Sequence, residues 1–413
     1  MEENRELDTF SQELKQELVE NILPYWVTHA LDTTYGGFYG YITTNNKVDK
    51  KASKGGILNS RILWTFSKAY HVLGDRHYLE AADHAYAYLR DTFLDRENGG
   101  VYWMVDHKGR PEETRKHIYN QSFAIYGLAE YFNATGHEES LQLAKELFYL
   151  IEKYGYDKQY GGYLEAFTRE WGMEEEHRLS EKDMAAEKSM NTHLHILEAY
   201  TNLFRVWKNP QLKERLTELI DVMLNHIVGP SYQFILFFDR KWRKLSDVVS
   251  YGHDIEGSWL LYEAAEVLGD EERLEKVREA TLNMAEKVIT DGLAENGGLM
   301  NEREADNVDK EKIWWVQAEG MVGFFNAYQL TLNNDYLKET FHLWRFTKQH
   351  MIDQRHGEWY WKLDEQNDAY HEMPKVEPWK CPYHNSRCCF ELLERLERHK
   401  TDHRKGVNDG GIY

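Results

Sequence analysis

Tyr35-Gly36-Gly37-Phe38-Tyr39-Gly40 decides the fold, because close copies of this turn and the short apolar run after it return along the chain. The copies read Asn98-Gly99-Gly100-Val101-Tyr102-Trp103, Tyr160-Gly161-Gly162-Tyr163-Leu164, Asn296-Gly297-Gly298-Leu299-Met300 and His356-Gly357-Glu358-Trp359-Tyr360-Trp361. Their first glycines are 63, 62, 136 and 60 residues apart, and the gap of 136 is about two periods. A sixth copy is therefore expected near Gly229, where the run 234–238 is apolar but lacks the double glycine.

A second marker has the same period. Glycine and asparagine tolerate the left-handed backbone that ends a helix, and a leucine-containing amphipathic segment follows each such site. The sites are Leu73-Gly74-Asp75, Thr135-Gly136-His137, Lys208-Asn209-Pro210, Leu268-Gly269-Asp270 and Asn333-Asn334-Asp335. The repeating unit is therefore a helix, a turn, a second helix and a glycine-rich hairpin.

Six such units that close on themselves predict an all-α (α/α)6 barrel, in which six outer helices surround six inner ones and short β-hairpins join the repeats. An open helical solenoid is the alternative. No linker interrupts the repeats, so residues 1–413 are expected to form a single catalytic domain. The first helix is expected over residues 8–23, ended by Pro24. The polar run 171–188 is a possible lid, and the tail after His399 is expected to fray.

Composition narrows the functional classes. The chain has 413 residues and a formal net charge of -20, which is unfavourable for binding nucleic acid or an anionic membrane. Its start does not resemble a signal peptide, and it has no apolar window long enough to span a membrane. Cys381, Cys388 and Cys389 lie near one end and do not suggest a disulfide framework. We expect a cytoplasmic protein.

The stretch from Ser250 to Leu261 contains the first candidate site residues, His253 and Glu256. Residues three apart share one face of a helix, so the carboxylate could orient the imidazole or tune its pKa. Histidine suits proton transfer in both directions near neutral pH, because its ordinary pKa is about 6.5. A helix-capping histidine beside a surface glutamate would show the same spacing.

Similar clusters occur at the same phase of every repeat, where an inner helix is expected to begin. In a closed barrel these positions converge on one rim. The candidates are Arg61; Tyr119, Asn120 and Gln121; Asn191, His193 and His195; His253 and Glu256; Trp314, Trp315, Gln317 and Glu319; and Trp379, Lys380, Cys381, His384, Asn385 and Arg387. Asn191 and His195 are four residues apart and share a face, whereas His193 points elsewhere and is expected to be structural.

Three other chemistries compete with proton transfer by histidines. A zinc site could draw on His193, His195, Cys381, His384, Cys388 and Cys389, but their spacing is poor for zinc. A glycoside hydrolase would need a dominant pair of carboxylates, which the rim lacks. A sugar-binding protein without turnover is the third. No phosphate-binding GxxxxGK[ST] loop occurs, so neither a cofactor nor a metal is expected.

The motifs Ser250-Tyr251-Gly252-His253-Asp254-Ile255-Glu256 and Trp379-Lys380-Cys381-Pro382-Tyr383-His384-Asn385 resemble those of the cellobiose 2-epimerases, a branch of the N-acylglucosamine 2-epimerase superfamily of (α/α)6 barrels. The resemblance runs from Arg61 to Arg387. It implies an arginine near the sugar C1 and C2 oxygens, three essential histidines and a carboxylate attending His253. By position these are Arg61, then His195, His253 and His384, then Glu256. It also implies substrate contacts from Tyr119, Asn191, Glu302, Trp379 and either Trp314 or Trp315.

The resemblance further implies reversible, cofactor-free inversion of C2 in the reducing-end glucose of a β-1,4-linked disaccharide. Cellobiose, lactose, mannobiose and short β-1,4 oligosaccharides are the expected substrates, and a monomer is expected. An enzyme acting on N-acetylglucosamine or free mannose is the nearest alternative, because it would use the same barrel and the same proton chemistry.

Overall fold

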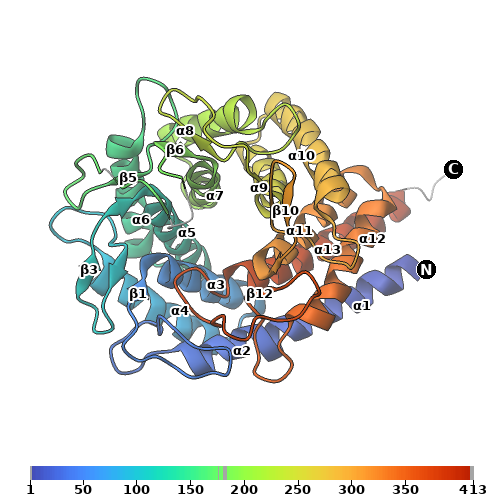
Figure 1. Cartoon of the computed structure of the whole chain (residues 1–413), viewed down its shortest axis with the longest axis horizontal. Coiled ribbons are helices and arrows are strands. Elements are labelled where there is room, and N and C mark those ends of the chain that lie inside the picture. Colours follow the sequence, from blue (N-terminus) through green and yellow to red (C-terminus); the bar gives the residue numbers. More distant parts are fainter. Residues whose placement is uncertain (1, 175, 180–183, 410–413) are drawn as a thin grey trace.

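The computed structural model describes residues 2–174, 176–179 and 184–409. Its helices form two concentric rings around one axis (Figure 1). The inner ring consists of α3 (Gly56–Leu73), α5 (Ile118–Thr135), α7 (Met190–Val206), α9 (Tyr251–Leu268), α11 (Trp314–Thr331) and α13 (Tyr383–Asp409). Consecutive inner helices contact one another, and α13 packs against both α11 and α3. The ring is therefore closed, which confirms the (α/α)6 barrel and excludes the open solenoid.

The outer ring is built from amphipathic helices that bury one stripe against the inner ring. Its members are α1 (Glu2–Gln16) with α2 (Leu23–Tyr25), then α4 (Arg76–Tyr88), α6 (Glu138–Leu150), α8 (Pro210–Val222), α10 (Glu271–Gly292) and α12 (Asn334–Phe346). Several continue as π-helical turns: Glu17–Ile22, Trp26–Ala30, Leu89–Phe93, Ile151–Gly155, Met223–Ile227 and Thr347–Met351. The inner helices are instead buried on nearly every side, as the continuous run Ile118–Tyr131 of α5 illustrates.

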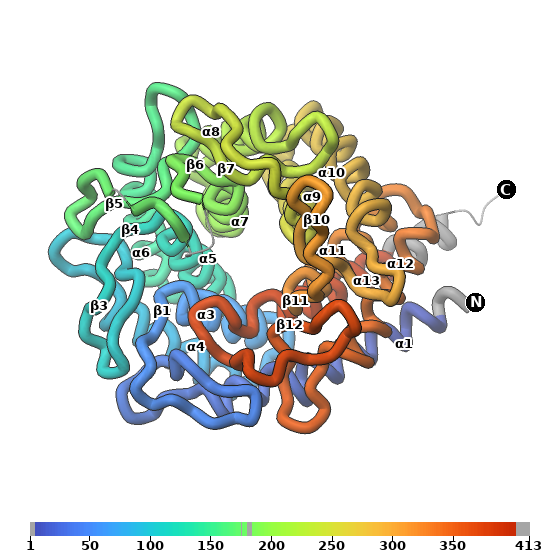
Figure 2. The backbone as a smooth tube through the Cα atoms, viewed as in Figure 1, coloured from blue at the N-terminus to red at the C-terminus, as the bar shows by residue number. Residues whose placement is uncertain are grey.

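Short strands join neighbouring repeats on one end of the ring (Figure 2). A strand directly before an inner helix pairs antiparallel with a strand of the next hairpin. The strands are β1 (Lys54–Gly55), β2 (Met104–Val105), β3 (Pro111–Glu113), β4 (Lys116–His117), β5 (Ala166–Phe167), β6 (Lys188–Ser189), β7 (Phe237–Phe238), β8 (Val249–Ser250), β9 (Glu302–Glu304), β10 (Asn307–Asp309), β11 (Lys312–Ile313) and β12 (Lys362–Leu363). A bridge between Ile42 and Val376 makes the sixth junction and joins the first repeat to the last.

The double glycine found in four of the hairpins has a steric reason. At Gly37 the backbone is left-handed, with φ of 65°, and an added Cβ would lie 2.4 Å from the ring of Tyr88. The predicted sixth hairpin is present, since Val228 bridges Phe234. There Tyr232 takes the left-handed conformation that glycine takes elsewhere.

Four hairpins also contain a buried ion pair. An aspartate in the turn pairs with a lysine that is 0–1% exposed; three of these lysines lie on the strand before an inner helix, and the fourth lies beside the Ile42–Val376 bridge. The pairs are Asp32–Lys54, Asp95–Lys116, Asp157–Lys188 and Asp353–Lys375. The first three pairs hold the start of an inner helix against a hairpin, and the fourth ties the loop before α13 to its hairpin, so together they support the rim where the candidate residues lie.

Helix ends follow the sequence signals at three of the five sites; in the third repeat α7 ends in an extended Trp207, and Asn209 caps the start of α8. Gly74, Gly136 and Gly269 take the left-handed conformation after their helices, as predicted. In the fifth repeat, however, Leu332 takes it with φ of 55°, and Asn333 instead caps the start of α12. A side-chain amide can cap the following helix by accepting its free N–H groups, so Asn333 serves the next element.

Three further expectations need correction or lie partly outside the described residues. Pro24 does not end the first helix, because the backbone stays helical from the π-helical turn Glu17–Ile22 through α2 to Trp26. The tail after His399 remains helical to Asp409. The possible lid, residues 171–188, includes positions 175 and 180–183, which are not described, so that expectation stays a prediction. Among the described residues, no helix is both long enough and apolar enough to cross a membrane.

Candidate active site

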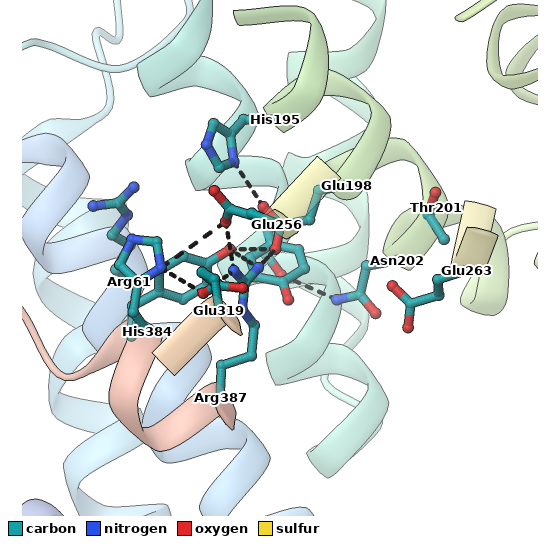
Figure 3. A network of polar contacts seen from close by, with 12 residues as sticks. Arg61, His195, Glu198, Thr201, Asn202, Glu256, Glu263, Glu319, His384 and Arg387 are labelled. Carbon is teal, nitrogen blue, oxygen red and sulfur yellow. Dashed lines mark hydrogen bonds and ion pairs between the residues drawn. The ribbon is translucent and has the colours of Figure 1, made fainter. Parts of the chain in front are cut away.

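The candidate residues lie in the N-terminal turns of the inner helices, the position that the repeat spacing predicts. Arg61 stands on α3, Tyr119 on α5, His195 on α7, His253 on α9 and His384 on α13. Six helices that run in the same direction around the axis bring these turns to one rim. Figure 3 shows His195, Glu198, Glu256, Glu319, His384 and Arg387 converging from different helices, with Arg61 beside them.

Two of the three histidines are backed by carboxylates. The Nδ1 atom of His195 lies 2.9 Å from Glu198 Oε2, and the Nδ1 atom of His384 lies 2.7 Å from Glu319 Oε1. An ionised carboxylate can only accept, so Nδ1 donates in each pair and the Nε2 lone pair is left to accept a proton. The third histidine, His253, contacts the hydroxyl of Ser250, with Nδ1 2.8 Å from Oγ.

Burial keeps His253 and His384 neutral. It lowers the pKa of His253 to about 3, with a smaller contribution from His195. The pKa of His384 lies well below its ordinary value because of burial and the nearby positive charges of Arg61 and Arg387. A neutral imidazole is the form that can act as a base.

The expected partnership between Glu256 and His253 is wrong. The Oε1 atom of Glu256 instead lies 2.5 Å from Nη2 of Arg387 and 3.9 Å from Nδ1 of His384. A buried guanidinium attracts a buried carboxylate more strongly than a neutral imidazole does. Glu256 therefore belongs to the side of the site that holds His384.

Three buried carboxylates surround Arg387. Nη1 donates to Glu198, and Nη2 lies 2.5 Å from Glu256 and 2.6 Å from Glu319. Burial raises the pKa of Glu256 to about 7, and the charge of Glu319 adds to the rise. Burial would also raise the pKa of Glu198, but Arg387 and His195 bring it down to about 2.

Arg61 is held by aromatic groups. Its Nη2 donates to the hydroxyl of Tyr119 at 2.7 Å, and its guanidinium lies 4.1 Å from the centre of the Phe123 ring. Its Nε atom is buried and makes no hydrogen bond within the described part of the chain. The side chain is thus fixed in place and retains donor capacity. Cys381 lies 4.0 Å from its Nη1.

The aromatic candidates separate into core and rim. Trp314 is 2% exposed, packs edge-on against Trp361 and lies beneath the ammonium of Lys380. Trp315 is half-buried, and its ring centre lies 4.8 Å from that of His253 and 5.5 Å from that of His384. The geometry therefore favours Trp315 over Trp314 as the tryptophan that meets substrate.

Trp379, Asn191 and Glu302 lie around the same rim. Trp379 is half-buried on the loop before α13, with its ring 5.9 Å from that of Tyr119. The Oδ1 atom of Asn191 is buried and accepts no hydrogen bond from the described residues. Glu302 is half-buried on β9 and pairs with Ser250, directly before the helix of His253.

Four other polar residues near the starts of inner helices have a structural role, because they fasten a hairpin to the helix. Gln121, His193, Asp254 and Gln317 each accept the backbone N–H of a neighbouring hairpin strand at 2.7–2.9 Å. His193 is structural, as expected from its spacing to His195.

Sequence reasoning passed over Glu198 and assigned no role to Arg387. Both were within reach of the spacing rule, since each lies three residues after a candidate histidine.

The residues proposed for zinc do not come together. The three cysteines are free and buried, and His193 is occupied by backbone contacts. A different set, Glu256, Glu319 and His384, has ligand atoms within 4.8 Å of one another. The Nη2 atom of Arg387 already lies between these two carboxylates and supplies the compensating positive charge.

A rim of histidines and carboxylates is suited to general acid–base catalysis. The sequence model of the N-acylglucosamine 2-epimerase family matches residues 37–388. The chain therefore belongs to this family.

Individual relatives narrow the class. A cellobiose 2-epimerase of Bacteroides fragilis is 45% identical over 94% of this chain and 99% of its own length. One of Dictyoglomus turgidum is 44% identical over 95% and 100%. The solved structure of cellobiose 2-epimerase from Bacillus thermoamylovorans superposes with a TM-score of 0.91 at 42% identity, covering 94% of this chain and 100% of that one. Within the family, the chain groups with the cellobiose 2-epimerases, which are carbohydrate isomerases.

Proposed function

We propose that the protein is a cofactor-free epimerase that inverts C2 of the reducing-end glucose in β-1,4-linked disaccharides. Cellobiose would become glucosyl-mannose, and lactose would become epilactose. Similarity to the cellobiose 2-epimerases supports the substrate class. The observation that carries the chemistry is the convergence of His195, His384 and Arg61 on one rim (Figure 3). His253 lies at the same rim, against the Trp315 ring that His384 also contacts.

The reaction needs two proton-transfer groups, because C2 loses a proton on one face and regains one on the other. A histidine first assists opening of the reducing ring. We propose that His384 then takes the C2 proton on Nε2 in the direction from glucose to mannose, since Glu319 stabilises the imidazolium that forms. After rotation about C2–C3, His253 returns a proton to the opposite face. Both histidines flank the ring of Trp315.

Deprotonation of C2 leaves an enediolate, whose negative charge lies on the C1 and C2 oxygens. Arg61 is the cation placed to stabilise it, because its guanidinium is already ordered by Tyr119 and Phe123 before substrate arrives. Such preorganised electrostatic stabilisation is often the largest contribution to catalysis.

The distal sugar ring must be bound by contacts that leave the reducing end free to react. Trp379 offers a half-buried aromatic face for this purpose, and Tyr119 lies beside it. Asn191 and Glu302 would bind sugar hydroxyls; the unpaired buried Oδ1 of Asn191 suits a hydroxyl donor. Remote contacts of this kind can be used to orient the reacting carbon.

We also propose that the whole chain acts as one catalytic domain, monomeric and cytoplasmic. Every proposed site residue comes from a single barrel, and all three cysteines are free. Light scattering coupled to size-exclusion chromatography tests the monomer: the expected mass is that of one 49.1 kDa chain.

Incubation with cellobiose in deuterated water tests the reaction. The expected product is glucosyl-mannose carrying deuterium at C2, read by chromatography and mass spectrometry. A ketose alone would indicate an aldose–ketose isomerase, monosaccharides would indicate a hydrolase, and unchanged cellobiose would indicate binding without turnover. His253→Asn and His384→Asn should each lower turnover by about 10²- to 10⁴-fold. A His384→Asn variant near the wild-type rate removes that residue from the mechanism.

A further inference from the structure

Arg387 occupies an unusual place in the barrel. It stands on α13, one turn after His384, and its side chain is 1% exposed. From there it reaches Glu256 on α9, Glu319 on α11 and Glu198 on α7, the helix on the opposite side of the ring. The rings of Trp259 and Tyr383 pack within 5 Å of its guanidinium, at 4.8 and 4.2 Å.

The carboxylates that Arg387 holds are the ones that hold the histidines. Glu198 uses Oε1 for Arg387 and Oε2 for His195. Glu319 uses the same Oε1 for Arg387 and for His384. One guanidinium therefore joins two histidine–carboxylate pairs that lie on three different helices, α7, α11 and α13.

We propose that Arg387 is a positioning residue that fixes the tautomer and orientation of both His195 and His384 through Glu198 and Glu319. The inference rests on the proposed epimerase function and deepens it. A guanidinium presents its donors in a rigid planar fork, so it fixes the direction of each carboxylate as well as its charge. Each carboxylate in turn keeps the proton on Nδ1 of its histidine and leaves Nε2 free to react.

The same helix contains a matched control. Arg395 lies two turns beyond Arg387, is 7% exposed and also faces the ring of Trp259. It contacts Glu391, Asn326 and Gln329, and none of these contacts a histidine of the rim in the described part of the chain. A purely structural role for a buried arginine on α13 should therefore show equally at both positions.

Arg387→Lys and Arg395→Lys are the variants to compare. Lysine keeps the positive charge but cannot hold three carboxylates in a fork. Arg387→Lys should lower kcat for cellobiose at least 100-fold with KM changed less than about threefold, because Arg387 acts through the histidines and not on the sugar. Arg395→Lys should keep kcat within about threefold while lowering the melting temperature comparably.

A second measurement reads the histidines directly. With ¹⁵N-labelled histidine, the wild-type spectrum should show His195 and His384 as Nδ1–H tautomers, assigned with the His195→Asn and His384→Asn variants. Arg387→Lys should convert both to a mixture or to the Nε2–H form, and Arg395→Lys should leave both unchanged. If Arg387→Lys alone is unstable, the double variant with Glu256→Gln leaves the lysine only Glu198 and Glu319 to hold and serves in its place.

These outcomes separate the two proposals. Unchanged tautomers in Arg387→Lys overturn the positioning role whatever happens to the rate, and so does a kcat loss no larger than that of Arg395→Lys. If the wild-type protein fails to epimerise cellobiose, the proposed function falls, while the tautomers still decide whether Arg387 controls the histidines.

Discussion

Glu256 and Glu319 share one guanidinium nitrogen, yet the structure predicts opposite consequences for their replacement. Their ligand atoms are at most 4.8 Å apart. Two unit charges at that distance repel by about 3.5 kcal/mol at an effective dielectric constant of about 20, enough to raise a pKa by about 2.5. Arg387 offsets part of this repulsion, but burial still raises the pKa of both carboxyl groups, that of Glu256 to about 7. We therefore expect the pair to hold a proton near neutral pH.

The contacts indicate which carboxylate holds that proton. Glu319 accepts hydrogen bonds from His384 at 2.7 Å and from the indole N–H of Trp259 at 3.0 Å, and both favour its charged form. Glu256 accepts neither, and burial followed by the charge of Glu319 raises its pKa to about 7. We therefore expect Glu256 to be the member of the pair that holds the proton, which makes glutamine its close mimic.

Glu256→Gln should therefore keep kcat/KM within about 10-fold of wild type. Glu319→Gln removes the acceptor for the Nδ1–H of His384 and the charge that stabilises its imidazolium. Loss of the orienting carboxylate beside a catalytic histidine lowers kcat by up to about 10⁴-fold in serine proteases. We expect a loss of about 10²- to 10⁴-fold here, equivalent to about 2.7–5.4 kcal/mol of transition-state stabilisation.

The assay is initial-rate epimerisation of cellobiose near pH 7, read by chromatography, with the melting temperature of each variant measured in parallel. The reverse order of losses would refute the proton assignment. Equal losses would do so too, because they would mean that the two carboxylates are interchangeable.

Three further predictions follow from the site. Since the pKa of Glu256 is about 7 in the native protein and 4.5 when unfolded, its contribution to stability is complete below pH 4.5 and lost as pH rises through 7. Urea unfolding should show wild type losing up to about 3 kcal/mol relative to Glu256→Gln between pH 5 and 8; a constant difference would contradict this. Exhaustive chelation should leave full activity, and a loss restored by a divalent metal would contradict the cofactor-free mechanism. Trp379→Ala should lower kcat/KM for cellobiose with little change in melting temperature, whereas Trp359→Ala, at 0% exposure, should cost about 3–5 kcal/mol of stability. A large fall in the melting temperature of Trp379→Ala would assign that residue to the core.

The repeat period predicted the barrel and the rim because both depend on spacing along the chain. The period could not tell which residues of a cluster face the site. Tyr119 accepts a hydrogen bond from Arg61 through its hydroxyl, whereas Gln121 accepts the backbone N–H of a hairpin residue. Each residue turns a helix by about 100°, and the absolute rotation of a helix is set by its neighbours. The same uncertainty left Trp314 and Trp315 unresolved until packing placed the first in the core.

The pairing of Glu256 failed for a different reason. The spacing of three residues is local, and it correctly relates His195 to Glu198, whose side chains do meet. At His253 the same spacing misleads, because a cation from a helix 131 residues away along the chain takes the carboxylate. Three acidic side chains on the inner faces of α7, α9 and α11 require a buried positive charge. That charge comes from Arg387 on α13, the last inner helix. Because α13 reaches these side chains only when the ring closes against α3, local spacing in the sequence could not identify Arg387 as their partner.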